Sequence, residues 1–453
     1  MSVSDYAKLA DGIAADISAG RLKPGERLPP QRTFAFERGI AVSTASRVYG
    51  ELYRRGLIVG EVGRGTFIAG QAHRPELNRP DPPSLSAEPA GRIDLEVNFP
   101  MLADQGEVLA RSLQPLMTAG NLTEALRAAP FAGSAASREA ASQGLSRGGW
   151  TPAPESFLFT GAGRQAIGAA ITALVPIGGR IGVEAVTYPQ IKSLATRLGA
   201  TLVPLAMDEE GVRPDAIAKA HRDSPLQALY IQPALHNPIG TSFSPARRQA
   251  MADLAEQLDL KIIEDWIYGF LCDDPPLAAL VPHRAIVVDS LSKRIAPGLG
   301  LGFINAPTAL HEALKAGIRA GGWSATGFAL AAGQRLFEDG TAAELAARKR
   351  QDAVERQKLA ARCFKGFELA TDPRAYHLWL TLPERWRSEA FASAAARQGI
   401  ALSPSSAFTV GQGHAPNAVR LALASPTLPQ LEASLDLLAR LLRSEPEAFQ
   451  VTE

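Results

Sequence analysis

The sequence contains few cysteines and no long apolar run. Its 453 residues include only two cysteines, Cys272 and Cys363, which excludes a disulfide framework and a metal site built from locally spaced cysteines. No apolar run reaches the roughly 18 residues that a membrane-spanning helix needs, and the first residues lack the apolar stretch of a signal peptide. We therefore expect reduced thiols, no association with a membrane and a cytoplasmic location.

The chain also lacks net charge of either sign, with 47 Lys and Arg against 46 Asp and Glu. This balance averages over regions, because residues 1–72 carry ten basic side chains against seven acidic ones. Such an excess is a weak indication that the first region binds nucleic acid. The composition is that of a globular protein, and the length exceeds what one core supports, so we expect a large and a small domain.

A stretch that is dense in proline and polar residues divides the chain at residues 71–92, and it is typical of a linker. Beyond it, short apolar or β-branched runs alternate with segments of helical periodicity; these runs are SFLFT, RIGVEA, ALYIQ, KIIED and AIVVD. The alternation predicts βαβ units and a mostly parallel sheet in a second domain of residues 93–453. Its last part, from about residue 340, predicts a smaller α+β lobe with strands at 375–382 and 418–424.

The first 70 residues have the outline of a helix-turn-helix followed by a hairpin. The pattern predicts three helices and a hairpin, at 6–19, about 31–39, 44–55 and 57–68. We expect Ser43 to be the N-cap of the third helix, and Ala45, Val48 and Leu52 to form its buried face at helical spacing. The hairpin turns at Arg64 between two glycines, where a basic side chain can approach a phosphate backbone closely.

The run GERLPPQRTFAFERGIAVSTASRVYGELYRRGLIVGEVGRGTFI resembles the winged helix-turn-helix of the GntR regulator family. The resemblance implies that the second helix of the motif reads double-stranded DNA. The contacts that it implies are made by Arg32, Ser43, Thr44, Ser46, Arg47 and Arg64. Serine, threonine and arginine near the start of a recognition helix are residue types that contact base edges and phosphates.

Three polar residues follow three predicted strands of the large domain. Asn237 comes after ALYIQ, Asp265 ends KIIED and Lys293 comes after AIVVD. Because ligands bind at the carboxyl ends of strands in an α/β sheet, we expect these residues to converge on one pocket. A lysine beside Ser290 and Ser292, ahead of a glycine-rich loop, suggests a nucleophilic amine near an anion site. Partial burial and a carboxylate for the cofactor's pyridinium nitrogen are what a Schiff-base lysine requires.

These motifs resemble those of the fold type I aminotransferases, which use pyridoxal 5′-phosphate, over roughly residues 94–442. The resemblance implies that Lys293 carries the cofactor as a Schiff base and that Asp265 pairs with its pyridine nitrogen. The other residues that it places around the ring and the phosphate are Asn237, Tyr268, Tyr188, Ser290, Ser292, Gly163 and Arg164. Arg420 in AVRLAL matches the arginine that takes a substrate α-carboxylate, a task that suits a guanidinium group. No metal is expected.

Two features depart from the pattern of this family. Gly300, in PGLGLG, stands where the family usually has an arginine that grips the cofactor phosphate, and the loss of such a contact costs roughly 1.5–3 kcal/mol. Arg164 or Arg294 could supply the missing positive charge. A tyrosine that often reaches the phosphate of the partner subunit is also absent, since Ala128-Ala129-Pro130 stands there.

A winged helix joined through a linker to an aminotransferase-like body resembles the MocR subfamily of GntR regulators. The resemblance implies a homodimer on paired DNA half-sites, whose large domain senses a small amino compound. In this interpretation the effector forms an external aldimine with the cofactor held on Lys293, and DNA binding changes. An active aminotransferase that carries a regulatory DNA-binding domain, and a DNA-binding scaffold that has lost its cofactor, stay open as alternatives. The effector, the target operon and the direction of regulation also stay open.

Overall fold

The computed structural model describes residues 4–18, 21–23, 26–54, 57–61, 65–68, 92–411 and 415–445. The chain divides into two compact units, residues 1–87 and 88–453. The linker expected at 71–92 lies outside the described residues except for Arg92, and so does Arg64 of the expected wing. No described helix is long and apolar enough to cross a membrane.

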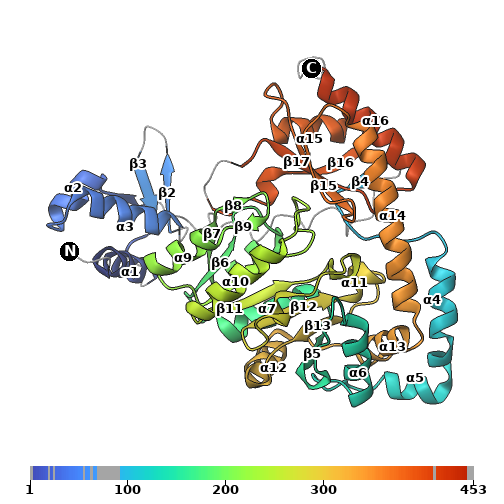
Figure 1. Cartoon of the computed structure of the whole chain (residues 1–453). Helices are drawn as coiled ribbons and strands as arrows, with labels where there is room; N and C mark the ends of the chain where they lie inside the picture. Colours follow the sequence, from blue (N-terminus) through green and yellow to red (C-terminus); the bar gives the residue numbers. More distant parts are fainter. Residues whose placement is uncertain are drawn as a thin grey trace. The chain divides into compact units, whose positions relative to one another are not determined.

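The first unit is a small winged helix (Figure 1). Its elements are α1 (Ser4–Ser18), β1 (Arg27–Leu28), α2 (Gln31–Glu37), α3 (Val42–Arg54), β2 (Ile58–Glu61) and β3 (Gly65–Ile68). β3 is the central strand and pairs antiparallel with both others, so the expected helix-turn-helix and hairpin are present. One detail of the prediction is wrong. The N–H groups of Thr44 and Ala45 bond to the carbonyl of Ala41, so Ser43 lies inside the first turn of α3 and is not its N-cap.

One face of α3 forms the core of this unit. Ala45, Val48 and Leu52 are fully buried, as their spacing predicts, and they pack with side chains of the other helices and of the sheet. Tyr49 makes an edge-to-face contact with Phe34, with ring centroids 5.4 Å apart. Burial of a leucine side chain contributes about 1.5–3 kcal/mol to folding. The opposite face of α3 is thereby left for solvent or a ligand.

The second unit is built on a seven-stranded sheet. In spatial order its strands are β5 (Phe157–Thr160), β13 (Gly302–Asn305), β12 (Ala285–Ser290), β11 (Lys261–Asp265), β10 (Ala228–Ile231), β6 (Arg180–Glu184) and β7 (Thr201–Leu205). β13 runs antiparallel to both of its neighbours, and the other neighbouring pairs are parallel. The prediction of a mostly parallel sheet is confirmed. Strands β7 and β13 were not predicted.

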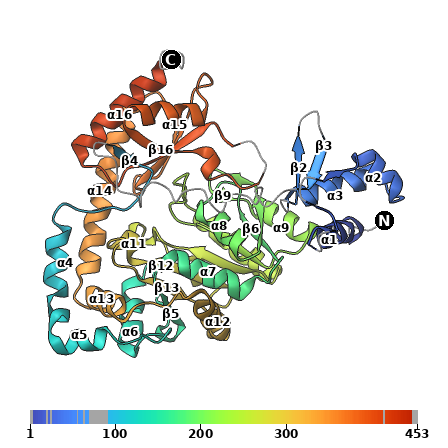
Figure 2. The ribbon, with the colours of Figure 1, turned by 180° about the vertical axis from the view of Figure 1, so that it is seen from behind.

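Helices cover both faces of this sheet (Figures 1 and 2). The first face, which includes Ile263 and Val288, packs against α7 (Gly163–Leu174), α8 (Gln190–Arg197) and α12 (His311–Gly321). The opposite face packs against α6 (Ala135–Leu145), α9 (Pro214–Asp223), α10 (Pro245–Gln257) and α13 (Gly327–Glu338). Because both faces are covered, the strands are continuous apolar runs such as Ala285-Ile286-Val287-Val288. Short α4 (Gln105–Leu113), α5 (Ala119–Ala125) and the pair β8 (Met207–Asp208) and β9 (Gly211–Val212) complete this part.

A second sheet forms a smaller lobe in the same unit. Its spatial order is β14 (Leu369–Ala370), β15 (His377–Thr381), β17 (Ala418–Ala422), β16 (Ile400–Pro404) and β4 (Ile93–Leu95). The edge strand β4 comes from the start of the unit and pairs parallel with β16. Helices α15 (Ser388–Arg397) and α16 (Leu428–Arg443) pack on this sheet around Trp386 and Phe391. The long α14 (Thr341–Cys363) runs from the large sheet's helices to this lobe (Figure 1).

Candidate functional site

The residues predicted to form a ligand pocket lie at the carboxyl edge of the large sheet. Asp265 is the last residue of β11, Asn237 lies in the loop that follows β10, and Lys293 lies in α11 (Leu291–Arg294), directly after β12. These three strands are neighbours and parallel. Their carboxyl ends therefore meet at one edge, as in other α/β ligand sites.

Lys293 lies in a confined position between a carbonyl group and an aromatic ring. Its Nζ donates to the backbone oxygen of Asn98 at 2.5 Å and lies 3.5 Å from the ring centroid of Phe99. Burial, and next the charge of Arg420, lower the pKa of Lys293 to about 7, while the Asp265 carboxylate opposes this shift. A large fraction of the amine is thus uncharged near pH 7, which is the form that attacks a carbonyl carbon.

Asp265 is buried and held by two hydrogen bonds. The hydroxyl of Tyr230 donates to its Oδ2 at 2.6 Å, and the backbone N–H of Ile267 donates to its Oδ1 at 3.2 Å. Burial raises the pKa of Asp265 to about 6, although both hydrogen bonds favour the ionised form. A carboxylate in this state gains by pairing with a positive charge. A protonated ring nitrogen of a ligand would provide one.

Tyr268 belongs to a buried network that the sequence did not reveal. Asn98 donates from Nδ2 to the Tyr268 hydroxyl at 2.9 Å, and the same Nδ2 lies 3.4 Å from Nδ1 of His377. His377 Nε2 lies 3.0 Å from the carbonyl oxygen of His236, which can only accept, so Nε2 carries the proton and Nδ1 accepts. Burial lowers the pKa of His377 to about 3, which keeps the ring neutral. This network fixes the Asn98 amide and the Tyr268 ring.

Tyr188 lies close enough to Arg164, Asp265 and Tyr268 for each of them to affect the pKa of its hydroxyl. Burial raises the pKa of its hydroxyl, the charge of Arg164 lowers it, and Asp265 and Tyr268 raise it. Arg164 itself is exposed, and no ion pair with it is found in the part of the chain that the structure describes. Its positive charge at the start of α7 is therefore available for an anion.

The start of α7 and the start of α11 lie beside each other. A Cβ on Gly163 would be 3.3 Å from both Cβ and Oγ of Ser290, so the two residues are in close contact. Ala162, the N-cap of α7, forms no side-chain cap, which leaves N–H groups of the first turn free. Ser290 Oγ accepts from the N–H of Ser292 at 3.2 Å and caps α11. Free N–H groups at a helix start, with hydroxyls next to them, suit a phosphate.

The absence of an arginine at Gly300 has a structural reason. A Cβ at this position would lie 2.7 Å from the carbonyl oxygen of Gly161, which is closer than side chains approach backbone atoms. The backbones of the two loops therefore occupy the space that a side chain would need. An arginine at this position requires a different path of one of these loops.

Arg294 is not available to replace the missing arginine. Its Nη2 lies 2.6 Å from Oδ2 of Asp289, and both side chains are buried. Its guanidinium carbon also lies 5.5 Å from the ring centroid of Phe270. Of the two arginines considered from the sequence, only Arg164 has a charge free to meet a phosphate.

The buried pair of Arg294 and Asp289 leads to a stability prediction. In an Arg294→Met variant the Asp289 carboxylate stays buried without its partner, and we expect the free energy of unfolding to fall by about 3–5 kcal/mol. Arg213→Met is the matched control, because it removes an exposed pair with Asp215 whose expected contribution is below about 1 kcal/mol. Urea unfolding of the full chain measures both changes. Equal losses in the two variants would contradict this account.

Arg420 reaches the same pocket from the small lobe. It lies in β17, is buried, and donates from Nη2 to Ser403 Oγ at 3.1 Å and to the Glu96 carbonyl oxygen. Its guanidinium carbon lies 5.1 Å from the ring centroid of Phe408. Burial lowers the pKa of Arg420, yet a guanidinium keeps its charge at neutral pH. The charge of Arg420 affects the pKa values of Lys293 and Tyr268, so the guanidinium lies near both side chains.

Several buried polar atoms around the pocket lack hydrogen-bond partners among the described residues. They include Oδ1 of Asn98, Oδ1 of Asn237 and Nε of Arg420. Buried polar atoms normally find partners, so such a group indicates that a polar ligand completes the site. These polar atoms without partners lie near the uncharged amine of Lys293, the buried carboxylate of Asp265 and the uncapped start of α7. Together, these groups fit pyridoxal phosphate. The described residues contain no group of three His, Cys, Asp or Glu side chains that could hold a metal.

Five of the six predicted DNA-contacting residues are described by the structure, and they lie on the outer side of the winged helix. Arg32, Ser43, Ser46 and Arg47 are exposed, and Thr44 is half-buried. The guanidinium carbon of Arg47 lies 5.8 Å from the ring centroid of Tyr6, which steadies the arginine on the surface. These side chains come from α2 and the first turns of α3, where a recognition helix presents its contacts.

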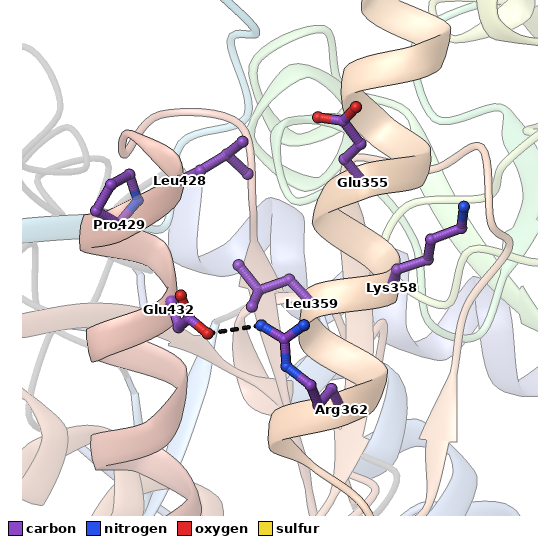
Figure 3. Close-up of a pocket in the computed structure, with 7 residues that line it drawn as sticks. All are labelled: Glu355, Lys358, Leu359, Arg362, Leu428, Pro429 and Glu432. Atoms are coloured by element: carbon purple, nitrogen blue, oxygen red, sulfur yellow. Dashed lines mark hydrogen bonds and ion pairs between the residues drawn. The ribbon is translucent and has the colours of Figure 1, made fainter.

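A groove of about 320 Å³ lies elsewhere, between α14 and α16 (Figure 3). It is lined by Glu355, Lys358, Leu359, Arg362, Leu428, Pro429 and Glu432. The groove is open, and Arg362 and Glu432 form an ion pair of 2.6 Å across it. None of its residues belongs to the Lys293 pocket, and we assign it no role.

Comparisons with known proteins find a matching family for each of the two units of the chain. The family model for aminotransferase class I and II matches residues 91–438, and that for bacterial regulatory proteins of the gntR family matches residues 5–68. YdeF of Bacillus subtilis (strain 168), an uncharacterized HTH-type transcriptional regulator, is 29% identical over 440 residues, which cover 96% of this chain and 94% of the relative. PdxR of Corynebacterium glutamicum, an HTH-type pyridoxine biosynthesis transcriptional regulator, is 27% identical over 314 residues, which cover 66% of each chain.

Solved structures show the fold of the larger unit. An archaeal alanine:glyoxylate aminotransferase superposes with a TM-score of 0.70 at 22% identity, covering 78% of this chain and 91% of that one. The expected fold type I architecture is therefore confirmed. The chain belongs to the aminotransferase class I and II family and joins to it a gntR-family DNA-binding domain, which is the MocR architecture of transcriptional regulators.

Proposed function

We propose that this protein is a transcriptional regulator that holds pyridoxal phosphate on Lys293 and changes its binding to DNA when a small amino compound enters the pocket. The observation that carries the proposal is the position of the Lys293 amine, which lies between the Asn98 carbonyl oxygen and the Phe99 ring and close enough to Asp265 and Arg420 for both charges to act on it. The name of the relative PdxR, a pyridoxine biosynthesis transcriptional regulator, also associates this group of proteins with vitamin B6.

Each residue of the pocket has a distinct task in this proposal. Pyridoxal phosphate, when bound, supplies an aldehyde that condenses reversibly with amines and a ring that withdraws electrons. Lys293 holds it covalently, and the Asp265 carboxylate keeps the ring nitrogen protonated. Asn237 and Tyr268 donate to the phenolic oxygen of the ring, and Tyr188 stacks on the ring. The phosphate is held by the start of α7 and its neighbours: Gly163, Arg164, Ser290 and Ser292.

Arg420 selects the effector in this proposal. Its guanidinium lies near Lys293 and has an Nε without a partner in the described part of the chain, so it can bind a carboxylate. An amino acid in this site would bring its amine beside Lys293, and its carboxylate would pair with Arg420. The preferred effectors are therefore amino acids, and vitamin B6 compounds are tested beside them.

The visible spectrum of the purified full chain tests cofactor binding. Addition of pyridoxal phosphate is expected to produce a yellow absorption band, and borohydride reduction followed by peptide mapping is expected to place the label on the Lys293 peptide. No band, or a label spread over other lysines, would overturn the proposal for the large domain. It would leave a DNA-binding scaffold that has lost its cofactor.

An active aminotransferase is the second candidate function. It is supported by the proximity of the lysine to a carboxylate and an arginine, since the charges of Asp265 and Arg420 both act on Lys293. The two candidates differ in turnover. Sustained transfer of an amino group from an amino acid to a keto acid supports the enzyme, while a change in DNA affinity without turnover supports the regulator.

For the DNA-binding half, we propose that a homodimer binds paired half-sites through α3. A DNA fragment selected by the wild-type protein from a random library serves as the probe. An Arg47→Ala variant is expected to lose about 1–3 kcal/mol of binding, or about 5- to 150-fold in affinity, measured by fluorescence anisotropy. Arg21→Ala is the matched control, since Arg21 is exposed in the same unit but pairs with Asp16. Equal DNA affinities of the Arg47→Ala and Arg21→Ala variants would show that Arg47 does not contact the DNA.

A further inference from the structure

A buried lysine in the middle of α14 lies directly behind the helix that carries Lys293. Lys349 is fully buried, and its Nζ donates to the carbonyl oxygens of Lys293 at 3.3 Å, Arg294 at 3.0 Å and Ile295 at 2.7 Å. An ammonium group has three donors, and all three are used here. Burial lowers the pKa of Lys349 to about 7, and the three carbonyl oxygens around Nζ favour its charged form. No described carboxylate lies within ion-pair distance of this ammonium, so backbone carbonyl groups are its partners.

The three carbonyl groups stand at the end of α11. This helix has only four residues, Leu291–Arg294, and the last carbonyl groups of a helix have no partner within it. A positive charge at a helix C-terminus is favourable because it meets the negative end of the helix dipole. Lys349 therefore holds the end of the very segment whose start is capped by Ser290.

Other side chains of α14 hold neighbouring segments in the same way. Arg350 donates from Nε to the carbonyl oxygen of Phe270 at 2.8 Å and from Nη2 to that of Cys272 at 3.1 Å. Phe270 and Cys272 lie two and four residues after Tyr268. Lys349 and Arg350, which are adjacent on α14, thus bind backbone carbonyl groups next to Lys293 and shortly after Tyr268.

The next turns of α14 hold the small lobe. Arg356 donates to the carbonyl oxygens of Leu423 and Pro426, each at 2.7 Å, just beyond the strand that carries Arg420. Gln357 donates to the carbonyl oxygen of Ala375 at 2.8 Å and to that of His377 at 3.0 Å. The segments that carry Lys293, Tyr268, His377 and Arg420 are therefore all attached to this one helix through backbone carbonyl groups.

We propose that Lys349 is a positioning residue for Lys293, which fixes the Lys293 segment to α14 and through α14 to the small lobe. Lys349 keeps the Lys293 amine in a fixed orientation. It also couples any displacement of the Lys293 segment, through α14, to a displacement of the small lobe that carries Arg420. The part of this inference that concerns a bound cofactor rests on the proposed function. The attachment of the segment itself does not.

The test compares three full-length variants with the wild type. Lys349→Met removes the three donors while keeping an unbranched side chain of similar length, and Lys349→Gln keeps an amide donor without the charge. Lys358→Met is the matched control, because Lys358 lies on the same helix and is exposed. Lys349→Gln takes the place of Lys349→Met if the latter does not fold.

The first measurement is amide hydrogen exchange without any cofactor. Lys349→Met is expected to exchange at least tenfold faster than the wild type in peptides that cover residues 291–301, with no such change in the α7 helix, and Lys358→Met is expected to match the wild type. Unchanged exchange in residues 291–301, or a uniform increase over the whole chain, would overturn the proposal. Failure of both Lys349 variants to fold would do the same, because Lys349 would then be a general stability residue.

The second measurement is the circular dichroism of the visible band after addition of pyridoxal phosphate. This signal depends on a fixed orientation of the bound group, which a residue with a purely structural role elsewhere would not alter. Lys349→Met is expected to lose at least half of the signal per bound cofactor, and an unchanged signal would contradict the proposal. If the wild type shows no visible band, the proposed function fails, and the exchange measurement alone decides the role of Lys349.

Discussion

Replacement of Lys293 by alanine is expected to abolish covalent binding of pyridoxal phosphate. The Lys293 amine is the one that the pocket makes nucleophilic, since burial and Arg420 lower its pKa to about 7, compared with about 10.4 for an exposed lysine. The variant should show no yellow band and no borohydride-trapped label at residues 291–301. Lys315→Ala, which removes a surface lysine paired with Glu312, should leave both unchanged.

The same pKa predicts how the reaction of Lys293 depends on pH. The uncharged amine reacts, and its fraction rises as the pH increases through the pKa. The rate of cofactor incorporation in the wild type should therefore increase up to about pH 8 and then level off, where an ordinary lysine would still be almost fully charged. A rate that keeps increasing to pH 10, or a band that persists in Lys293→Ala, would contradict the assigned role.

Replacement of Arg420 by methionine is expected to remove the preference for amino acids over the corresponding amines. The guanidinium is buried, and loss of one partner of a buried charge pair costs about 2–5 kcal/mol, which corresponds to about 30- to 5,000-fold in affinity. Titration of the cofactor-loaded protein with an amino acid and with its decarboxylated amine, followed by the visible spectrum, measures both affinities. The amino acid should bind much more weakly to the variant, while the amine should bind about equally to both proteins.

Arg440→Met is the matched control for this experiment. Arg440 lies on α16 at the surface of the small lobe and should leave the preference unchanged. The removal of Arg420 should also raise the pKa of Lys293, since the Arg420 charge is one of the causes that lower it. A variant that keeps the preference for amino acids would show that the carboxylate binds elsewhere.

The parts of the fold with strong local patterns could be predicted from the sequence. Runs such as Ala285–Ser290 are apolar on both faces and end in polar residues, so they indicated both the buried strands and the edge where ligands bind. Strand β13 was missed because its four residues, Gly302–Asn305, begin with glycine and end with asparagine. Strand β4 was missed because its three residues are ordered by pairing with β16, which is distant in sequence.

The residues behind the site could not be predicted in the same way. Asn98 and Lys349 act through contacts with segments about 195 and 55 residues away, which no local pattern records. The prediction that Arg294 could meet the cofactor phosphate failed because Arg294 is buried in an ion pair with Asp289. The sequence shows Asp289 only as a polar residue near the end of a strand, so it does not reveal this pair. The glycine at position 300, in contrast, was noticed from the sequence, but only the structure shows that the Gly161 carbonyl leaves no room for a side chain.

The central claim is that occupancy of the Lys293 site changes DNA binding. The most direct test is fluorescence anisotropy of the selected DNA fragment with the cofactor-loaded wild type and with Lys293→Ala, over a panel of amino acids, amines and vitamin B6 compounds. We predict that at least one amino compound changes the dissociation constant of the wild type fivefold or more and leaves that of Lys293→Ala unchanged. An equal response of both proteins, or no response of the wild type to any compound, would contradict the account.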